Sequence, residues 1–158
     1  MRRKFKVILY EKMKENPKIW VITPDLGYGF FKEIKKNFPD RFVQCKATEN
    51  LAMGIAVGLA ENNLIPVIYS ITPFLLSTPH SFIRNYINHE KVPVKLLGGG
   101  RTNDYYHDGF SHYAGDDLDI IYAFENIKCF WPHDEKALEI ETDKWLNHYG
   151  PAYLNLKR

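Results

Sequence analysis

The most constraining feature of the sequence is an acid, Glu49, placed between a short apolar segment and a long run of small and apolar residues. Residues 42–45 predict a buried strand, and residues 51–60 predict an almost wholly apolar helix. The glycines and alanines of this run lower its helix propensity, but they allow two backbones to approach closely. We therefore expect the helix to pack tightly against another helix or another subunit.

This pattern alone leaves two interpretations of Glu49 open. An acid in the first turn of a helix is stabilised by the helix dipole, and that role needs no chemistry. A buried acid where a strand gives way to a helix can instead carry a chemical task, because burial changes its affinity for a proton. The first interpretation is the more common one for an acid at this position of a helix.

The remainder of the chain alternates between predicted helices and strands. A first helix, with Phe5, Ile8, Leu9 and Met13 on one face, must end before Pro17. Further helices are expected at 30–38, 75–89, 116–124 and 134–148, and strands at 19–23, 42–45, 65–71, 92–97, 127–131 and 152–156. Six buried strands separated by helices predict one α/β domain over residues 1–158. We expect a doubly wound, mostly parallel six-stranded sheet with helices on both faces.

Composition excludes several classes of protein. The 158 residues are 45% hydrophobic with a formal net charge of +2, so the chain lacks the electrostatic footprint of a nucleic-acid-binding protein. Residues 2–4, Arg-Arg-Lys, are most simply a solvated helix face. No apolar run is long enough to span a bilayer and the N-terminus lacks a signal sequence, so we expect a cytoplasmic location without membrane association. Cys45 and Cys129 are expected to be buried free thiols.

The longest irregular segment, 98–114, follows a predicted strand, and open α/β sheets bind ligands at the carboxyl ends of their strands. Its three glycines do not fit a dinucleotide-binding fingerprint, and a flexible tether is the alternative. His107, Asp108 and His112 are weak candidates for metal ligands, because two histidines five residues apart in a loop are not specific. We expect no metal ligands in this chain.

A series of motifs resembles, in order and spacing, the pyrimidine-binding domain of transketolases, a family that binds thiamine diphosphate. The series runs over nearly the whole chain. It consists of Glu49 with its Gly/Ala-rich helix, Pro66-Val-Ile-Tyr, Phe74, Ile83-Arg84, Asp108-Gly-Phe-Ser-His and Pro132-His-Asp.

The resemblance implies roles for four of these residues. Glu49 would share a proton with N1′ of the cofactor's pyrimidine and so favour its 4′-imino form, a role that a raised pKa suits. Phe74 matches an aromatic residue that stacks on the pyrimidine, and Ile71 stands at a neighbouring aromatic position, although a place in the core is the alternative for Ile71. His112 would act near the cofactor's amino group and the reacting carbonyl.

The same resemblance places a substrate beside the loop, with departures from the family pattern. Asp108 would bind a substrate hydroxyl together with His112, and Arg101 is a further candidate for a substrate contact. Phe110 replaces the usual proline. Gly100 stands where a substrate-contacting histidine is frequent, and Gly29 stands near a frequent phosphate-binding serine, so the identity of the sugars stays open.

The family binds the diphosphate and Mg²⁺ through a Gly-Asp-Gly motif that this chain lacks. We therefore expect the Mg²⁺ ligands on a second subunit, in a hetero-oligomer such as a heterotetramer that acts on a sugar or sugar phosphate. The expected activity is transfer of a two-carbon ketol unit. Another thiamine diphosphate-dependent carboligase or decarboxylase, or a non-catalytic domain of the same fold, are the alternatives.

Overall fold

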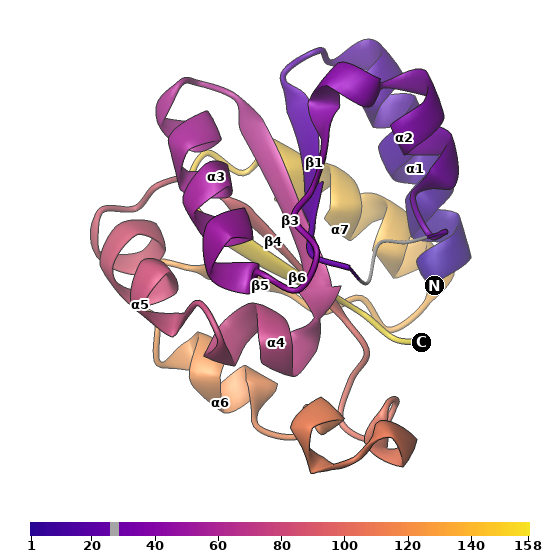
Figure 1. The fold of residues 1–158 in the computed structure, drawn as a ribbon. Coiled ribbons are helices and arrows are strands. Elements are labelled where there is room, and N and C mark those ends of the chain that lie inside the picture. Colours follow the sequence, from indigo (N-terminus) through magenta and orange to yellow (C-terminus); the bar gives the residue numbers. More distant parts are fainter. Residues whose placement is uncertain (26–28) are drawn as a thin grey trace.

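The computed structural model describes residues 1–25 and 29–158 and contains one sheet of six parallel strands in the order β2-β1-β3-β4-β6-β5 (Figure 1). The strands are β1 Ile19–Thr23, β2 Phe42–Gln44, β3 Ile65–Ile71, β4 Lys95–Gly99, β5 Lys128–Phe130 and β6 Ala152–Leu156. The α/β class and the parallel six-stranded sheet predicted from the sequence are confirmed.

Helices cover both faces of the sheet (Figure 1). They are α1 Arg2–Glu15, α2 Lys32–Asn37, α3 Glu49–Glu61, α4 Thr72–Ser77, α5 His80–Phe82, α6 Asp117–Tyr122 and α7 Glu135–Asn147. One apolar cluster lies between the sheet and α1, α2 and α7, where Phe5 meets Trp145 edge to face. The other lies under α3, α4 and α6 and includes Met53 and Leu75. Two cores on opposite faces explain why the strands between them are mainly apolar.

Prolines account for the main differences between the predicted and observed elements. Residues 75–89 form α4, α5 and a π-helix, Ile83–His89, in place of one helix, and Pro79 stands immediately before α5. β4 begins at Lys95, because Pro93 has no N–H to donate to the sheet. In the described part of the chain, no helix is both long and apolar enough to cross a bilayer.

The carboxyl end of β4 is tightly packed at Gly98. A Cβ atom built there would lie 2.7 Å from the Tyr153 hydroxyl oxygen and 2.8 Å from Oγ1 of Thr72. Gly58 in α3 is the opposite case, since a Cβ there would have no atom within 4 Å. The two glycines therefore form a matched pair for testing the packing.

Gly98→Ala should lower the free energy of unfolding by about 1–3 kcal/mol, because its methyl group overpacks a closed polar layer. Gly58→Ala should raise that free energy by up to about 1 kcal/mol, because alanine loses less backbone entropy in a helix. Urea unfolding of both variants checks the pair. Equal stability of the Gly98 variant and the wild type would contradict tight packing at the end of β4.

Candidate active site

The segments that carry the residues predicted for the site follow the carboxyl ends of β2, β3 and β4 (Figure 1). Glu49 begins α3 after β2, Ile71 ends β3 and precedes α4, and the loop with Asp108 and His112 follows β4. This edge of an open parallel sheet is where ligands bind in doubly wound folds. The topology thus places the candidate residues where chemistry is expected.

Phe74 and His112 are in contact, although they come from different elements. Phe74 lies on α4, and His112 ends the 3₁₀ turn Phe110–His112. Their ring centroids are 5.0 Å apart and their planes cross at 84°, an edge-to-face arrangement that aromatic pairs favour. The imidazole Nδ1 lies 3.1 Å from Oγ of Ser111, and the backbone N–H of His112 donates to the Gly109 carbonyl. A residue predicted to bind the cofactor and a residue predicted to be catalytic are therefore in direct contact.

Glu49 and Ile71 approach the same edge from neighbouring segments. Glu49 is the first residue of α3 and is partly buried, so this chain alone encloses only part of its carboxylate. Thr48 precedes it as N-cap, with its hydroxyl bonded to the Cys45 carbonyl and not to the helix. Ile71 is 8% exposed and pairs in register with Gly99 of β4. Its side chain thus belongs mainly to the core.

Asp108 is exposed at the end of the 3₁₀ turn Tyr106–Asp108. Its Oδ2 lies 3.4 Å from Nε2 of His107, and the same nitrogen lies 3.2 Å from Nη1 of Arg158. Arg158 also donates through its backbone N–H to Asp104. Polar contacts therefore connect the loop to the residues that follow β6.

Arg101 is directed into the protein. Its Nε donates to Oδ1 of Asn155, its Nη2 donates to the carbonyls of Pro132 and Asn155, and the guanidinium lies 4.2 Å from the centre of the Trp131 ring. These bonds hold the start of the loop against β6. In this arrangement Nε and Nη2 of the guanidinium are bonded within the protein itself.

Tyr105 fills the space beside Gly100. A Cβ atom on Gly100 would lie 2.5 Å from the Tyr105 ring, and the glycine has a φ of +87°, a conformation that side-chain-bearing residues rarely adopt. The Tyr105 hydroxyl accepts a hydrogen bond of 2.7 Å from Nη1 of Arg2. The histidine frequent here in the family is thus incompatible with this backbone and this tyrosine.

A cationic cavity of about 590 Å³ lies beside these residues and was not predicted. Arg2, Arg3, Lys6 and Arg158 line it together with Gly29 and one acid, Glu135. The interpretation of residues 2–4 as a solvated helix face is incomplete, because the Arg2 guanidinium lies 4.9 Å from the centre of the Phe30 ring. Arg2 and Arg3 were the only hint of this cavity in the sequence. Their proximity to Gly29 and Arg158 depends on the tertiary fold and could not be predicted from the sequence.

A buried polar network beneath the loop was not predicted either. Nδ2 of Asn155 lies within hydrogen-bonding distance of Oγ1 of Thr72, the Gly100 carbonyl, Oδ2 of Asp117 and the Tyr153 hydroxyl. Asp117 is 4% exposed, and burial raises the pKa of its carboxyl to about 6, although bonds from Tyr153 and the Leu118 N–H oppose the rise. The network joins β4, β6, α4 and α6 below the site.

The two cysteines are free, as predicted, and each is only partly buried. Burial raises the pKa of both thiols, that of Cys129 to about 11, so neither is an activated nucleophile. Among residues 1–25 and 29–158, no three His, Cys, Asp or Glu side chains are grouped as a metal site.

Comparison with known proteins identifies the family. Residues 1–158 match the family described as "Transketolase, pyrimidine binding domain". The chain belongs to this family. It is 30% identical, over 77% of its length, to one of the subunits of the apulose-4-phosphate transketolase of Actinobacillus succinogenes. It is also 30% identical, over 98% of its length, to 1-deoxy-D-xylulose-5-phosphate synthase of Anaeromyxobacter sp. (strain K).

A solved structure described as "Split gene transketolase, inactive beta4 tetramer" superposes with a TM-score of 0.84 at 30% identity, over 99% of this chain. The chain spans 39% of the Actinobacillus protein, 24% of the Anaeromyxobacter protein and 51% of the chain in that structure. This pyrimidine-binding domain therefore corresponds to one part of larger proteins.

Asp117 provides a test of the buried network through pH. Its pKa is about 6 in the folded chain and ordinarily 3.8, so the unfolded chain loses this proton first as pH rises. Asp117 therefore opposes folding increasingly from about pH 4 to 6 and by a constant amount above that, up to about 3 kcal/mol at 1.36 kcal/mol per pH unit. Asp117→Asn should lose this component of the pH dependence.

Urea unfolding of both proteins at intervals from pH 4 to 7 makes the comparison. All other carboxylates are common to the two proteins, so the difference between their curves isolates Asp117. Parallel curves would show that this carboxyl does not titrate in the folded protein as its burial requires.

Proposed function

We propose that this chain is the pyrimidine-binding part of a thiamine diphosphate-dependent, transketolase-like enzyme that transfers a two-carbon ketol unit between sugars. The observation that carries the proposal is the contact between Phe74 and His112 at the carboxyl edge of the sheet where Glu49 begins α3. A second polypeptide supplies the diphosphate and Mg²⁺ site, and the two chains form a hetero-oligomer.

The residues present fit the pyrimidine half of the cofactor. Phe74 offers an aromatic ring, Ile71 an apolar wall and Glu49 a carboxyl group, which together suit a flat heterocycle with a basic nitrogen. For the diphosphate and Mg²⁺, neither a Gly-Asp-Gly motif nor a metal-ligand cluster occurs among residues 1–25 and 29–158. This division between the two halves supports a partner chain.

Each side chain has a definable task in the proposed reaction. When bound, thiamine diphosphate supplies the carbon nucleophile that carries the transferred unit. Glu49 holds a proton at N1′, and closure of the partly buried site by the partner chain strengthens that interaction by removing water. His112 donates a hydrogen bond to the substrate carbonyl oxygen, and Asp108 accepts one from a substrate hydroxyl.

The cationic cavity suggests where an anionic substrate group binds. Arg2, Arg3 and Arg158 line this cavity, and the guanidinium group of arginine matches phosphate oxygens with paired donors. Because Gly29 carries no side chain, backbone and arginines replace the serine that is frequent near this position. A sugar phosphate is therefore the substrate class that the site supports best.

The similarity to 1-deoxy-D-xylulose-5-phosphate synthase supports a second candidate, a carboligase of different donor specificity. Both candidates use the same cofactor residues in this chain, so the difference must lie in the substrates accepted. Assay of the reconstituted enzyme with ketose phosphates and with 2-oxo acids as donors separates them.

Purification of the chain with its partners from its native source, followed by mass spectrometry, tests the proposal as a whole. We expect a second chain that contains Gly-Asp-Gly, and the reconstituted pair should show thiamine diphosphate-dependent ketol transfer. Recovery without such a chain, and no activity with any thiamine enzyme of the same cell, would favour a non-catalytic domain.

In the reconstituted enzyme, Glu49→Gln should slow deuterium exchange at C2 of bound thiamine diphosphate by about a hundred- to ten-thousand-fold. The amide keeps the size of the side chain but cannot share its proton with N1′. Exchange measured by NMR at saturating cofactor tests this step without any sugar. Glu61→Gln, an exposed change in the last residue of α3, is the control and should exchange normally.

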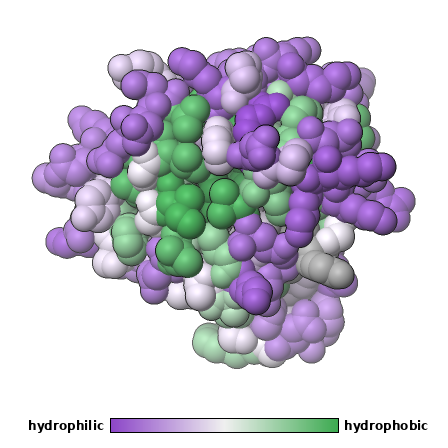
Figure 2. Space-filling model, turned by 45° about the horizontal axis from the view of Figure 1, so that its top comes forward, coloured by the Kyte–Doolittle hydropathy of each residue, from purple (hydrophilic) through white to green (hydrophobic). Residues whose placement is uncertain are grey.

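The outer face of α3 is the expected contact with the partner. Leu51 is 57% exposed, and Gly54, Ile55, Gly58 and Leu59 are only partly buried. Figure 2 shows hydrophobic residues gathered in one patch on the side of the molecule where α3 lies. A patch of this kind on an otherwise polar surface typically marks an interface.

Gly58→Leu should block assembly with the partner while leaving the isolated chain folded, because its side chain would extend into space that is open in this chain. Sedimentation velocity of the mixed chains measures assembly, and thermal unfolding of the variant alone measures folding. The helix would not be the interface if the variant assembled with wild-type affinity.

A further inference from the structure

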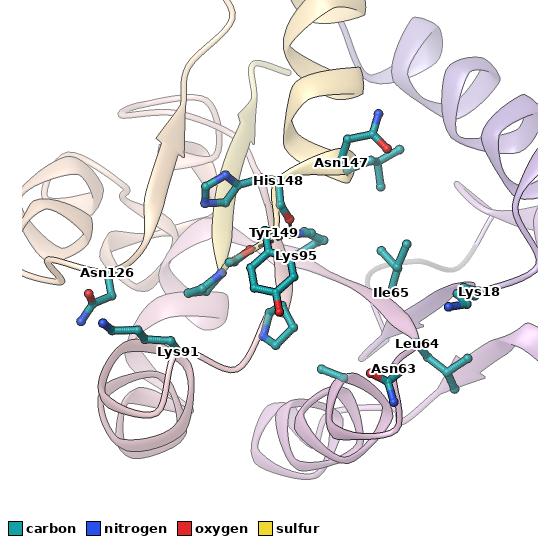
Figure 3. A pocket seen from close by; sticks show the side chains of 15 residues that line it. Lys18, Asn63, Leu64, Ile65, Lys91, Lys95, Asn126, Asn147, His148 and Tyr149 are labelled. Atoms are coloured by element: carbon teal, nitrogen blue, oxygen red, sulfur yellow. Dashed lines mark hydrogen bonds between the residues drawn. The ribbon is translucent and has the colours of Figure 1, made fainter.

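A second cavity lies at the opposite edge of the sheet, at the amino ends of the strands (Figure 3). Its volume is about 690 Å³, and it reaches the first residues of β3 and β4, Ile65 and Lys95, and the segment before β6. In Figure 3, Lys91 and Asn126 lie on one flank, Lys18 and Asn63 lie on the other, and Tyr149 stands between them. None of these residues belongs to the candidate active site.

Lys95 gives this cavity a buried positive charge. Its side chain is 2% exposed, and Nζ donates to the carbonyls of His148 at 2.5 Å and Gly150 at 2.7 Å. It forms an ion pair with none of the carboxylates in residues 1–25 and 29–158. A buried ammonium group is normally compensated by an anion, because burial strongly disfavours an isolated charge.

The rest of the lining adds positive charge and no negative charge. Lys18 and Lys91 are exposed at its two flanks, and no described Asp or Glu lines the cavity. The amide group of Asn63 provides a further donor, while Nδ2 of Asn126 also donates to the Asn88 carbonyl. A concave site with three ammonium groups and no carboxylate attracts anions.

We propose that this amino-edge cavity binds a small organic anion, one that carries a carboxylate, sulfonate or phosphate group on an apolar body. The apolar body is inferred from the remaining lining, which includes Leu64, Pro93 and the Tyr149 ring, 97% exposed. The volume lies within the range of small-ligand sites in proteins. The anionic group lies toward Lys95 and Lys91, and the apolar body lies against Tyr149.

A purely structural role for Lys95 makes a different prediction. His148 caps the C-terminus of α7, and a cation beside carbonyls at a helix C-terminus is stabilising without any ligand. That role involves neither Lys91 nor Lys18, and it requires no cavity. Variants of the two exposed lysines therefore distinguish a ligand site from a helix cap without disturbing the fold.

The experiment is a titration of the ¹⁵N-labelled chain with benzenesulfonate, followed by amide chemical shifts. We expect saturable shifts at Lys95, Leu64 and residues 147–150. Methanesulfonate has the same charge without the ring and should bind more weakly, because it cannot cover the apolar lining. Lys18→Gln and Lys91→Gln should each weaken binding about two- to fivefold, in line with single exposed charges. Lys144→Gln, on α7 outside the cavity, is the matched control and should bind as the wild type does.

A pH series adds a readout specific to Lys95, because the charge of a sulfonate is constant. Burial lowers the pKa of Lys95 to about 8, and burial also lowers the pKa of His148 below its ordinary 6.5. Affinity should therefore fall as pH rises from 7 to 9.

The absence of saturable shifts at the cavity would overturn the proposal, as would saturable shifts confined to Arg2, Arg3 and Arg158. Equal binding by the Lys18, Lys91 and Lys144 variants would also overturn it, because the lysines would then not recognise the anion. Binding that is independent of pH from 7 to 9 would remove Lys95 from the site and leave only the helix cap. None of these outcomes bears on the thiamine-dependent activity, which uses the other edge of the sheet.

Discussion

The carboxyl edge of this domain depends on the hydrogen bonds of the Asn155 side-chain amide. It lies on β6, with Nδ2 within reach of Thr72 on α4, the Gly100 carbonyl and Asp117 on α6, while Oδ1 accepts from Arg101. Four segments distant in sequence thus meet at one side chain. A buried amide cannot bond to water, so its donor and acceptor groups need partners within the protein. Hydrogen bonds to these partners fix the relative positions of the segments. The loop that carries Asp108 and His112 begins at this point.

That anchoring explains how a long irregular loop can present a defined site. Residues 100–116 contain two 3₁₀ turns and a bridge between Thr102 and Ala114. The loop is held at its start by Arg101 and along its length by Tyr105, whose ring packs on Gly100. Its tip remains open, since Phe110 is 83% exposed. The loop therefore combines an anchored base with an exposed end, and exposed loops on a fixed scaffold are where binding residues are commonly found.

Sequence patterns predicted the framework well because the strands are buried on both faces. The observed bounds of β1, β3 and β6 coincide with the predicted runs, which are mainly apolar and free of helix-period alternation. Errors arose where one residue ended an element, as at Pro79 and Pro93. The candidate site was predicted residue by residue from a family resemblance, and the structure adds the contact between Phe74 and His112. The packing of the Tyr105 ring against Gly100 was not predictable. A contact within an irregular loop produces no repeating pattern in the sequence.

Strand β4 has a cation near each end, Lys95, which is buried, and Arg101, which is partly buried. Both bond to β6 or to a segment next to it, and Arg101 also bonds to Pro132 after β5. At the amino end, Lys95 donates to the carbonyls of His148 and Gly150; just beyond the carboxyl end, Arg101 donates to Asn155 and Pro132. Carbonyl oxygens replace only part of the water that these cations lose, so they fix the positions of the side chains without neutralising their charge. The apolar pattern of the two strands does not by itself fix their register, because parallel apolar strands can pair in more than one alignment. The fixed carbonyl partners of Lys95 and Arg101 favour the alignment in which Leu96 pairs with Tyr153. This same alignment brings Asn155 level with Gly98. Fixation of the β4–β6 pair thus positions the site at one edge and the lysine-lined cavity at the other.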